Sequence, residues 1–393
     1  MFQRAQKTRH ASTYLPNNDV KLIDGGAPYF ELLEKMIRSA QYVVHFQVYI
    51  FEEDETGTRI AKALKEAALR KVKVYLLVDG YASKALSREF IQDLKDAGIN
   101  FRPFEPLLQS KKFYFGRRLH HKVVVVDSFY CLIAGLNISD RYNDTPKARA
   151  WLDWALFAEG EIAPALEKIC VNRYKLRIRA KHEAVHPAPL KISALKKNSH
   201  VRVRINDWVD RKREISRTYL EMFGTAKSHI TLMSPYFLPG YEFRRRMKQA
   251  VRRGVTIKVV LAGISDIALS KYAERYMYRW MLKNNVEIYE YQKTVLHGKM
   301  AVCDDQWMTV GSYNLNNLSA YASVELNFDV KDPEFAKTIN RRLQTIIDTD
   351  CQRITLKKYD KKTGWVEHVA QKLAYYLLRV ILFLFTFYFR QKE

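Results

Sequence analysis

The pattern of apolar and polar residues repeats along this chain in two halves. Each half predicts a strand, a helix, a second strand, a further helical segment and a short strand. The clearest of these are 42–51, 58–70, 72–79 and 100–102 in the first half, and 230–235, 243–253, 255–261 and 286–289 in the second. Alternation of this kind predicts mixed α/β sheets flanked by helices. We therefore expect an α/β fold of two homologous domains related by a pseudo-two-fold axis, with an active site at their interface.

The repeat also sets the predicted domain boundaries. They are 1–170 for the first half, 171–200 for a basic, proline-containing linker, 201–350 for the second half and 351–393 for an apolar tail. A chain of 393 residues is long enough for two domains with a core each.

A histidine–lysine motif follows the last short strand of each half. It comprises a histidine, a lysine two residues later, an aspartate five residues after the lysine and an asparagine 17 residues after the histidine. The two copies are His120, Lys122, Asp127 and Asn137, and His297, Lys299, Asp304 and Asn314. Side chains two apart on a strand point the same way, so each copy presents an imidazole beside an ammonium. A duplicated half-site predicts one site built from two halves.

Two such halves face to face suit chemistry at phosphorus. The two ammoniums and two carboxamides would surround one phosphate and stabilise its charge. One imidazole would attack phosphorus while the other protonates the leaving oxygen. The expected intermediate is a covalent phosphohistidine, which a second alcohol or water resolves.

Further residues take supporting roles. A nucleophilic histidine needs its other ring nitrogen held by an acceptor, and we assign Glu325 to this orienting role in the second half and Asp153 in the first. Asp127 and Asp304 belong to the catalytic motifs, but they have the opposite parity from their histidines. We therefore expect them to close turns or to pair with the backbone.

Small residues after the motifs (Gly135, Gly311 and Ser312) would let the backbone approach a ligand. No carboxylate cluster accompanies the histidines, so no metal or cofactor is predicted.

Net charge indicates which partners the protein could bind, and the cysteines indicate whether it has zinc or disulfide sites. The net charge of +24 favours a polyanion, which is nucleic acid or an anionic membrane. The four cysteines form no C-x-x-C pair, which argues against a zinc site or a disulfide framework. The first ten residues contain no apolar core of a secretory signal, so we expect a reducing compartment.

Two segments carry membrane-like features. The tail is apolar over 373–378 and 380–389, with Arg379 between them. Ten helical residues span about 15 Å, half of a hydrocarbon core of about 30 Å, and a mid-membrane arginine costs on the order of 3 kcal/mol. We therefore expect an interfacial or partly inserted anchor. The segment 111–118 interleaves cations with aromatic residues, which suits either nucleic acid or a membrane surface.

The duplicated motif resembles that of the phospholipase D superfamily, over nearly the whole chain. The resemblance implies metal-independent phosphodiester transfer through phosphohistidine. It implies that His120 is the nucleophile, that His297 is the general acid, and that phosphate is bound by Lys122, Lys299, Asn137 and Asn314. The family often has glycine where this chain has Ala134.

Other segments resemble bacterial cardiolipin synthases, most of all the B-type subfamily. They are 234–241 (Ser-Pro-Tyr-Phe-Leu-Pro-Gly-Tyr), 77–83 and 296–299. This resemblance implies a phospholipid transphosphatidylase that joins two phosphatidylglycerols into cardiolipin and releases glycerol. The implied partners are phospholipid substrates and an anionic membrane, with no nucleic acid. The implied location is the cytoplasmic face of the inner membrane, peripheral or partly inserted.

Two alternatives remain open from the residues. A hydrolase, nuclease or other phosphodiesterase of the same superfamily fits the charge but not the apolar tail. A non-catalytic membrane binder fits the tail but not the two intact motifs. Deletion of 365–393 should leave a nuclease unaffected and release a lipid enzyme from membranes.

Overall fold

A computed structural model describes residues 13–106, 117–146, 148–175, 189–316 and 323–387, without the side chains of 362 and 382–387. The chain forms two compact units. Unit 1 comprises Met1–Arg204, Val310–Ser312 and Glu325–Val330, and unit 2 comprises Ile205–Thr309, Tyr313–Val324 and Lys331–Glu393. Each unit is a mixed α/β sheet with flanking helices, as the sequence predicts. The division follows contacts rather than the repeat, because two short segments of the second half pack into unit 1.

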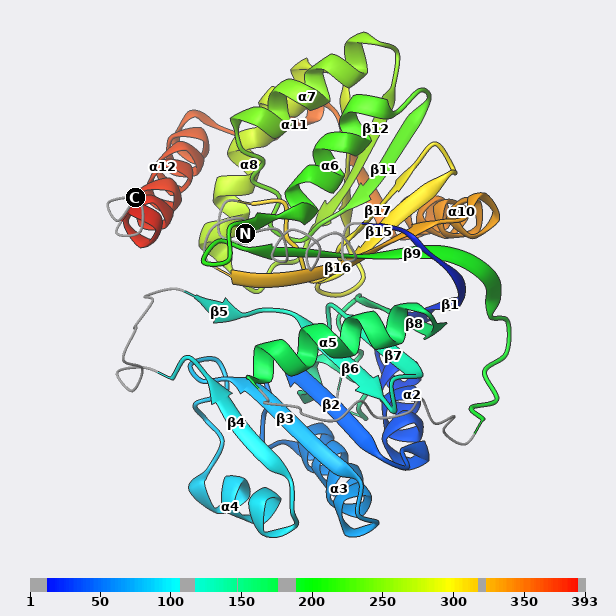
Figure 1. The fold of residues 1–393 in the computed structure, drawn as a ribbon. Helices are drawn as coiled ribbons and strands as arrows, with labels where there is room; N and C mark the ends of the chain where they lie inside the picture. The colour runs from blue at the N-terminus through cyan, green and yellow to red at the C-terminus, as the bar shows by residue number, and fades with distance from the viewer. Residues whose placement is uncertain (1–12, 107–116, 147, 176–188, 317–322, 388–393) are drawn as a thin grey trace, which may run out of the picture. The chain divides into compact units, whose positions relative to one another are not determined.

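The sheet of unit 1 has a parallel part and an antiparallel part (Figure 1). Its elements are β1 (Leu15–Asp24), α2 (Ala27–Ser39), β2 (Val43–Val48), α3 (Glu55–Leu69), β3 (Lys73–Asp79), α4 (Arg88–Asp96), β4 (Asn100–Phe104), β5 (Arg118–Leu119), β6 (Lys122–Val126), β7 (Tyr130–Ala134), the 3₁₀ turn η2 (Asp140–Tyr142), β8 (Trp154–Gly160), α5 (Ile162–Tyr174) and most of β9 (Lys196–Asp207). Strands β2, β3 and β4 run parallel. Strand β6 joins β2 in antiparallel direction, and β7, β8, β1 and β9 follow in turn.

The two faces of this sheet differ in chemistry. Alternate residues such as Val44, Phe46 and Val124 belong to an apolar core with α2 and α3. The intervening positions face α5, where the Gln47 amide donates to the Cys170 carbonyl at 2.8 Å. Period-two alternation therefore gives one apolar face and one partly polar face.

Unit 2 repeats this plan. Its elements are β10 (Lys212–Arg213), α6 (Glu214–Thr225), β11 (His229–Met233), α7 (Tyr241–Arg252), β12 (Thr256–Ala262), α8 (Ala268–Lys283), β13 (Val286–Tyr291), β14 (Met300–Cys303), β15 (Trp307–Gly311), β16 (Ser323–Lys331), α10 (Pro333–Asp350), β17 (Cys351–Ile354), α11 (Leu356–Lys362) and α12 (Trp365–Phe387). Strands β11, β12 and β13 are parallel, and β14 pairs antiparallel with β11. This arrangement matches β2, β3, β4 and β6 strand for strand. The end of β15 and most of β16 belong to unit 1.

The C-terminal helix α12 lies beside α8 (Figure 1). Ala374 and Tyr375 belong to the apolar core of unit 2, and Gln371 is fully buried. Residues on the opposite face, including Leu373 and Val380, are exposed. The predicted tail is therefore part of the fold over its first turns, which a purely anchoring segment would not be. Within the described part of the chain, no helix is both long and apolar enough to cross a lipid bilayer.

Candidate functional site

A tight turn closes the hairpin after each motif strand. Asp127 and Ser128 have φ values of 51° and 54°, and Asp304 and Asp305 have φ values of 51° and 53°. Two successive residues with positive φ make a type I′ turn, whose twist matches that of the paired strands. Asp tolerates this backbone better than most side chains do. The near-identical angles show that the repeat extends to the turn geometry.

The two motif aspartates bind the backbone. The Asp127 carboxylate accepts from the amides of residues 41, 42 and 43 at 2.7–2.9 Å. The Asp304 carboxylate accepts from the amides of residues 227, 228 and 229 at 2.7–2.9 Å. In each half the aspartate lies seven residues after its histidine and five after its lysine, and those five residues span about 16 Å along a strand. These contacts support the structural role predicted for the pair and separate it from the imidazoles.

His120 is held by a buried carboxylate. Its Nδ1 lies 2.9 Å from Oε2 of Glu325, which is fully buried. Ser312 also donates to this carboxylate, at 2.5 Å. Its place in the chain, after the second motif, predicts that Glu325 serves the second half. The structure instead places it beside the first motif, because β16 enters unit 1.

The charge state of Glu325 fits a hydrogen-bond acceptor. Burial works to raise the pKa of Glu325, but the nearby His120, Lys122 and Ser312 outweigh it and lower the pKa below its ordinary value. An ionised carboxylate only accepts hydrogen bonds, so the His120 Nδ1 carries the proton. This tautomer places the imidazole lone pair on Nε2.

Aromatic and cationic groups complete the surroundings of His120. The Tyr49 ring meets the His120 ring edge-on at 4.8 Å between centroids. The Lys122 ammonium lies 5.3 Å from the Tyr49 centroid and donates to the His120 carbonyl at 2.7 Å. Burial, with Asp79 as the next cause, raises the pKa of Tyr49 to about 12. Tyr49 therefore stays neutral and packs beside the imidazole. In the sequence, Tyr49 is one of several aromatic and aliphatic residues of the run 42–51, and nothing there marks it as a site residue.

Asp79 is a second residue near His120 that the sequence motifs do not identify. It ends β3, is fully buried, and accepts from the Leu119 amide at 2.8 Å. Its other oxygen accepts from the amides of Tyr81 and Ala82, both at 3.0 Å. Asp79 thus fixes the residue directly before His120. The available signal was its place at the carboxyl end of a parallel strand, where ligand-side loops begin.

The second motif has the same local form. His297 and Lys299 are almost fully buried, and the Lys299 ammonium donates to the His297 carbonyl. The same ammonium lies 3.0 Å from the His297 Nδ1. In both motifs, therefore, the lysine folds back onto its own histidine.

The two motif asparagines differ. The Asn137 carboxamide accepts from the Ile50 amide at 3.1 Å and donates to the Tyr142 hydroxyl at 2.8 Å. Asn314 is also buried, but its Oδ1 has no hydrogen-bond partner within the described residues. Asn137 thus ties together the loops around the first motif. Its amide nitrogen has two hydrogens, so the one not directed at Tyr142 can bind a ligand.

Asp153 is the repeat counterpart of Glu325. The Gly135 amide donates to the Trp154 carbonyl at 3.1 Å, and the Ser312 amide donates to the Leu326 carbonyl at 3.1 Å. Each carboxylate directly precedes the accepting residue, so Asp153 and Glu325 occupy matching positions. A Cβ atom at Gly135 would lie only 2.2 Å from the Asp153 carboxylate. Gly135 therefore makes room for a protein carboxylate, whereas the sequence predicts room for a ligand at this position.

A buried polar network holds the Pro-Tyr-Phe segment of unit 2. The Phe237 amide donates to Glu274 at 2.9 Å, and Lys271 bridges Glu274 and Glu290 at 3.0 and 2.8 Å. The Tyr278 hydroxyl donates to Glu290 at 2.8 Å. Burial raises the pKa of Glu274 above its ordinary value despite the nearby ammonium. The network fixes the start of the loop that leads into α7.

The described residues bear only in part on two further predictions, which concern a metal site and the segment 111–118. Within the described residues, no group of three His, Cys, Asp or Glu side chains is arranged to hold a metal ion. In the segment 111–118, residues 111–116 lie outside the described residues. Arg118 is described, and its guanidinium lies 3.6 Å from the Asp79 carboxylate.

Comparisons with known proteins agree on one family. A family model described as "Cardiolipin synthase, PLD-like domain" matches residues 33–147 and 219–347. Cardiolipin synthase B of Salmonella typhi is 32% identical over 374 residues, which cover 92% of this chain and 88% of the relative. Cardiolipin synthase B of Escherichia coli K12 is 32% identical over 373 residues, with the same coverage. A probable cardiolipin synthase of Bacillus subtilis is 28% identical and covers 83% of this chain and 65% of the relative.

Solved structures support the fold. A phosphatidylserine synthase from Haemophilus influenzae superposes with a TM-score of 0.74 at 14% identity, covering 98% of this chain and 99% of that one. A polyphosphate kinase from Porphyromonas gingivalis superposes with a TM-score of 0.60 at 16% identity, covering 92% of this chain and 53% of that one. At these identities the likeness concerns the fold alone.

Proposed function

The chain belongs to the family of cardiolipin synthases with phospholipase D-like domains, and we propose on that premise that it transfers a phosphatidyl group between two phosphatidylglycerol molecules. The products are cardiolipin and glycerol. The observation that carries the mechanism is the contact of the His120 Nδ1 with the buried Glu325 carboxylate at 2.9 Å.

In the first step, the Nε2 atom of His120 attacks the phosphorus of one phosphatidylglycerol. The bond between phosphorus and the glycerol oxygen breaks, and His297 donates a proton to that oxygen. Glu325 stabilises the charge that develops on the His120 ring. The result is a phosphatidyl-histidine and free glycerol. The duplication of the motif supports the use of both histidines in one reaction.

In the second step, His297 takes the proton from a glycerol hydroxyl of a second phosphatidylglycerol. That oxygen attacks phosphorus, the bond to His120 breaks, and cardiolipin forms. Lys122 and Lys299 stabilise the phosphoryl oxygens in both steps, with Asn137 and Asn314 as further donors. The position of Asp153 in the repeat supports it as the second orienting carboxylate.

We place the reaction at an anionic membrane surface, on the cytoplasmic face of the inner membrane. The net charge of +24 supports this location, as does the exposed apolar face of α12. The enzyme would act there as a peripheral or partly inserted protein.

The test is a product analysis. Purified protein is incubated with phosphatidylglycerol vesicles, and the lipids are separated and identified by mass. We expect cardiolipin with one glycerol released per cardiolipin formed, and neither product from His120→Ala. A Lys95→Gln variant, which changes an exposed residue of α4, serves as the matched control and should form both products.

Other outcomes would replace this proposal. Phosphatidic acid without cardiolipin would indicate a hydrolase of the same superfamily. The absence of any lipid turnover, together with cleavage of DNA or RNA, would indicate a nuclease.

Metal independence is a separate prediction. The proposed steps use imidazole and ammonium groups alone, so we expect an unchanged rate of cardiolipin formation in excess EDTA. Loss of activity that a divalent cation restores would contradict this prediction.

A further inference from the structure

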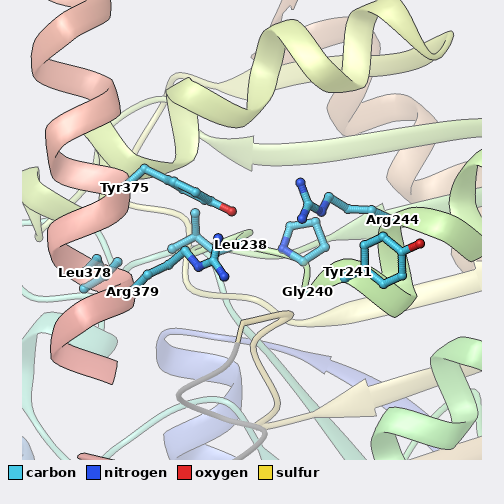
Figure 2. A pocket seen from close by; sticks show the side chains of 8 residues that line it. Leu238, Gly240, Tyr241, Arg244, Tyr375, Leu378 and Arg379 are labelled. Carbon is cyan, nitrogen blue, oxygen red and sulfur yellow. The ribbon is translucent and has the colours of Figure 1, made fainter. Parts of the chain in front are cut away.

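Unit 2 contains a small cavity between α12 and the start of α7. Leu238 and Leu378 form apolar parts of its wall, and Arg244, Tyr375 and Arg379 line it with polar groups. Figure 2 shows the Arg244 and Arg379 side chains extending toward the same space from the two helices, with the Tyr375 hydroxyl directed between them. No step of the proposed reaction uses these residues.

The two guanidiniums are arranged to receive an anion. Arg379 lies over the Tyr375 ring at 5.6 Å, and Arg244 lies over the Trp280 ring at 5.8 Å. Contacts of this type use the guanidinium face and leave the N–H edges, which bind phosphate oxygens bidentately. The Nε of Arg244 is buried and has no hydrogen-bond partner among the described residues. An anion in the cavity would therefore be bound through the terminal N–H groups of Arg244, because the Nε atom is closed to solvent.

The size of the cavity limits what can enter. Its volume is about 70 Å³. Because a water molecule needs roughly 10–15 Å³ in this measure, the space takes about five water-sized groups. A tetrahedral phosphate fits, whereas acyl chains must remain outside.

The exposed face of α12 indicates where such a phosphate comes from. Large apolar residues recur on this face at helical spacing, and they are Val366, Val369, Leu373, Leu377 and Val380. Lys372 and Arg379 lie at the border of this stripe. An apolar stripe with cations beside it is typical of a helix lying in the membrane interface, where lipid phosphates are found at the same depth.

We propose that this cavity binds the phosphate of an anionic phospholipid of the bilayer, which docks unit 2 on the membrane without itself reacting. The inference rests on the proposed lipid function. The Leu238 amide donates to the carbonyl of Leu315, the residue after Asn314, at 2.9 Å. Docking at the cavity would therefore hold the loop of the second motif at the lipid surface.

The test compares two double variants with equal loss of charge on the same two helices. Arg244→Gln/Arg379→Gln changes the cavity, and Arg245→Gln/Lys372→Gln changes exposed residues outside it. Both are made in a His120→Ala background, so binding is measured without turnover. Binding to vesicles of phosphatidylcholine with and without phosphatidylglycerol is followed by flotation, in low salt and in about 1 M NaCl, where the Debye length is about 3 Å.

We expect the cavity variant to bind phosphatidylglycerol vesicles about tenfold or more weakly than the control variant, with the difference persisting in high salt. Equal losses in the two variants that vanish in high salt would show diffuse charge attraction and overturn the site. A difference seen only for inorganic phosphate in calorimetry, and not for vesicles, would overturn the lipid as its source. A dimer that hides α12 and does not bind vesicles would also overturn it.

A second measurement separates docking from catalysis. With His120 restored, turnover of a short-chain phosphatidylglycerol below its micelle concentration should be the same in both double variants. A selective loss in the cavity variant would make the cavity part of the reacting site and contradict the proposal. If the chain makes no cardiolipin but the cavity variant still loses vesicle binding, the proposed function fails and the lipid site stands.

Discussion

At the scale of single residues, the proposed chemistry of His120 depends on Glu325. The carboxylate is fully buried, keeps a lowered pKa and contacts the His120 Nδ1. It therefore fixes both the tautomer and the ring orientation. Ser312 and Lys122 contribute to holding this carboxylate ionised.

Replacement of Glu325 by glutamine should lower kcat by roughly 10²- to 10⁴-fold, with little change in KM, because the amide keeps the volume but not the charge that stabilises the imidazolium. Steady-state formation of cardiolipin measures this effect. Glu31→Gln, at an exposed position of α2, is the control. A Glu325→Gln enzyme that keeps more than about a tenth of the activity would show that another group orients His120.

Asp304 predicts a pH dependence of stability. Its burial raises the pKa, but hydrogen bonds from the backbone amides of residues 227–229 prevail and lower it below the ordinary value. A lowered pKa in the folded state stabilises the fold above the unfolded-state pKa of about 4, and this contribution is lost as the pH falls through the folded-state pKa.

Asp304→Asn should therefore lower the melting temperature most at pH 7, and the difference from wild type should shrink as the pH drops below about 4. Thermal unfolding at several pH values measures it. Asp96→Asn, at the exposed end of α4, should show no comparable trend. A difference that is constant with pH would contradict the assignment.

At the scale of elements, the two faces of α12 have different surroundings. Its inner face fills the core of unit 2 next to α8, and its outer face is apolar and exposed. Deletion of 365–393, which the sequence suggested as a test of membrane binding, would also remove Tyr375 from the core. That deletion therefore cannot distinguish a lipid enzyme from a nuclease.

A shorter deletion separates packing of the core from binding to the membrane. Removal of 382–393 should leave the melting temperature nearly unchanged, since Gln371, Ala374 and Tyr375 remain. It should weaken vesicle binding by tenfold or more, because roughly two apolar side chains would no longer be buried in the membrane. Removal of 365–393 should destabilise the protein by about 3–5 kcal/mol or more, as expected for loss of a core aromatic residue. Calorimetry and flotation measure the two effects. Equal melting temperatures for both deletions would show that α12 does not support the core.

At the scale of the whole molecule, unit 1 is not a continuous stretch of sequence. It includes 310–312 and 325–330, and β16 pairs with both β5 and β9. Within this unit, Asp329 is fully buried and lies 2.9 Å from Arg202 and 3.4 Å from Arg204. A chain cut between the halves would leave these two arginines without that carboxylate.

Fragment 1–204 expressed alone should therefore fail to unfold cooperatively, because breaking a buried ion pair by removing one partner costs about 3–5 kcal/mol. Coexpression with 205–393 should restore a cooperative transition, as measured by circular dichroism on heating. A fragment 1–204 that melts cooperatively by itself would show that unit 1 does not need β16.

The sequence by itself determined the repeat, the α/β class and the two motifs, because period-two and helical patterns are local and the motif spacing repeats. It also placed the motif aspartates at turns, since their parity on the strand excluded the histidine side. Only the tertiary structure decided which histidine Glu325 serves, why Gly135 has no side chain, and which face of α12 is covered. These depend on contacts between distant segments, such as the 205 residues that separate His120 from Glu325, and no local pattern encodes such pairings.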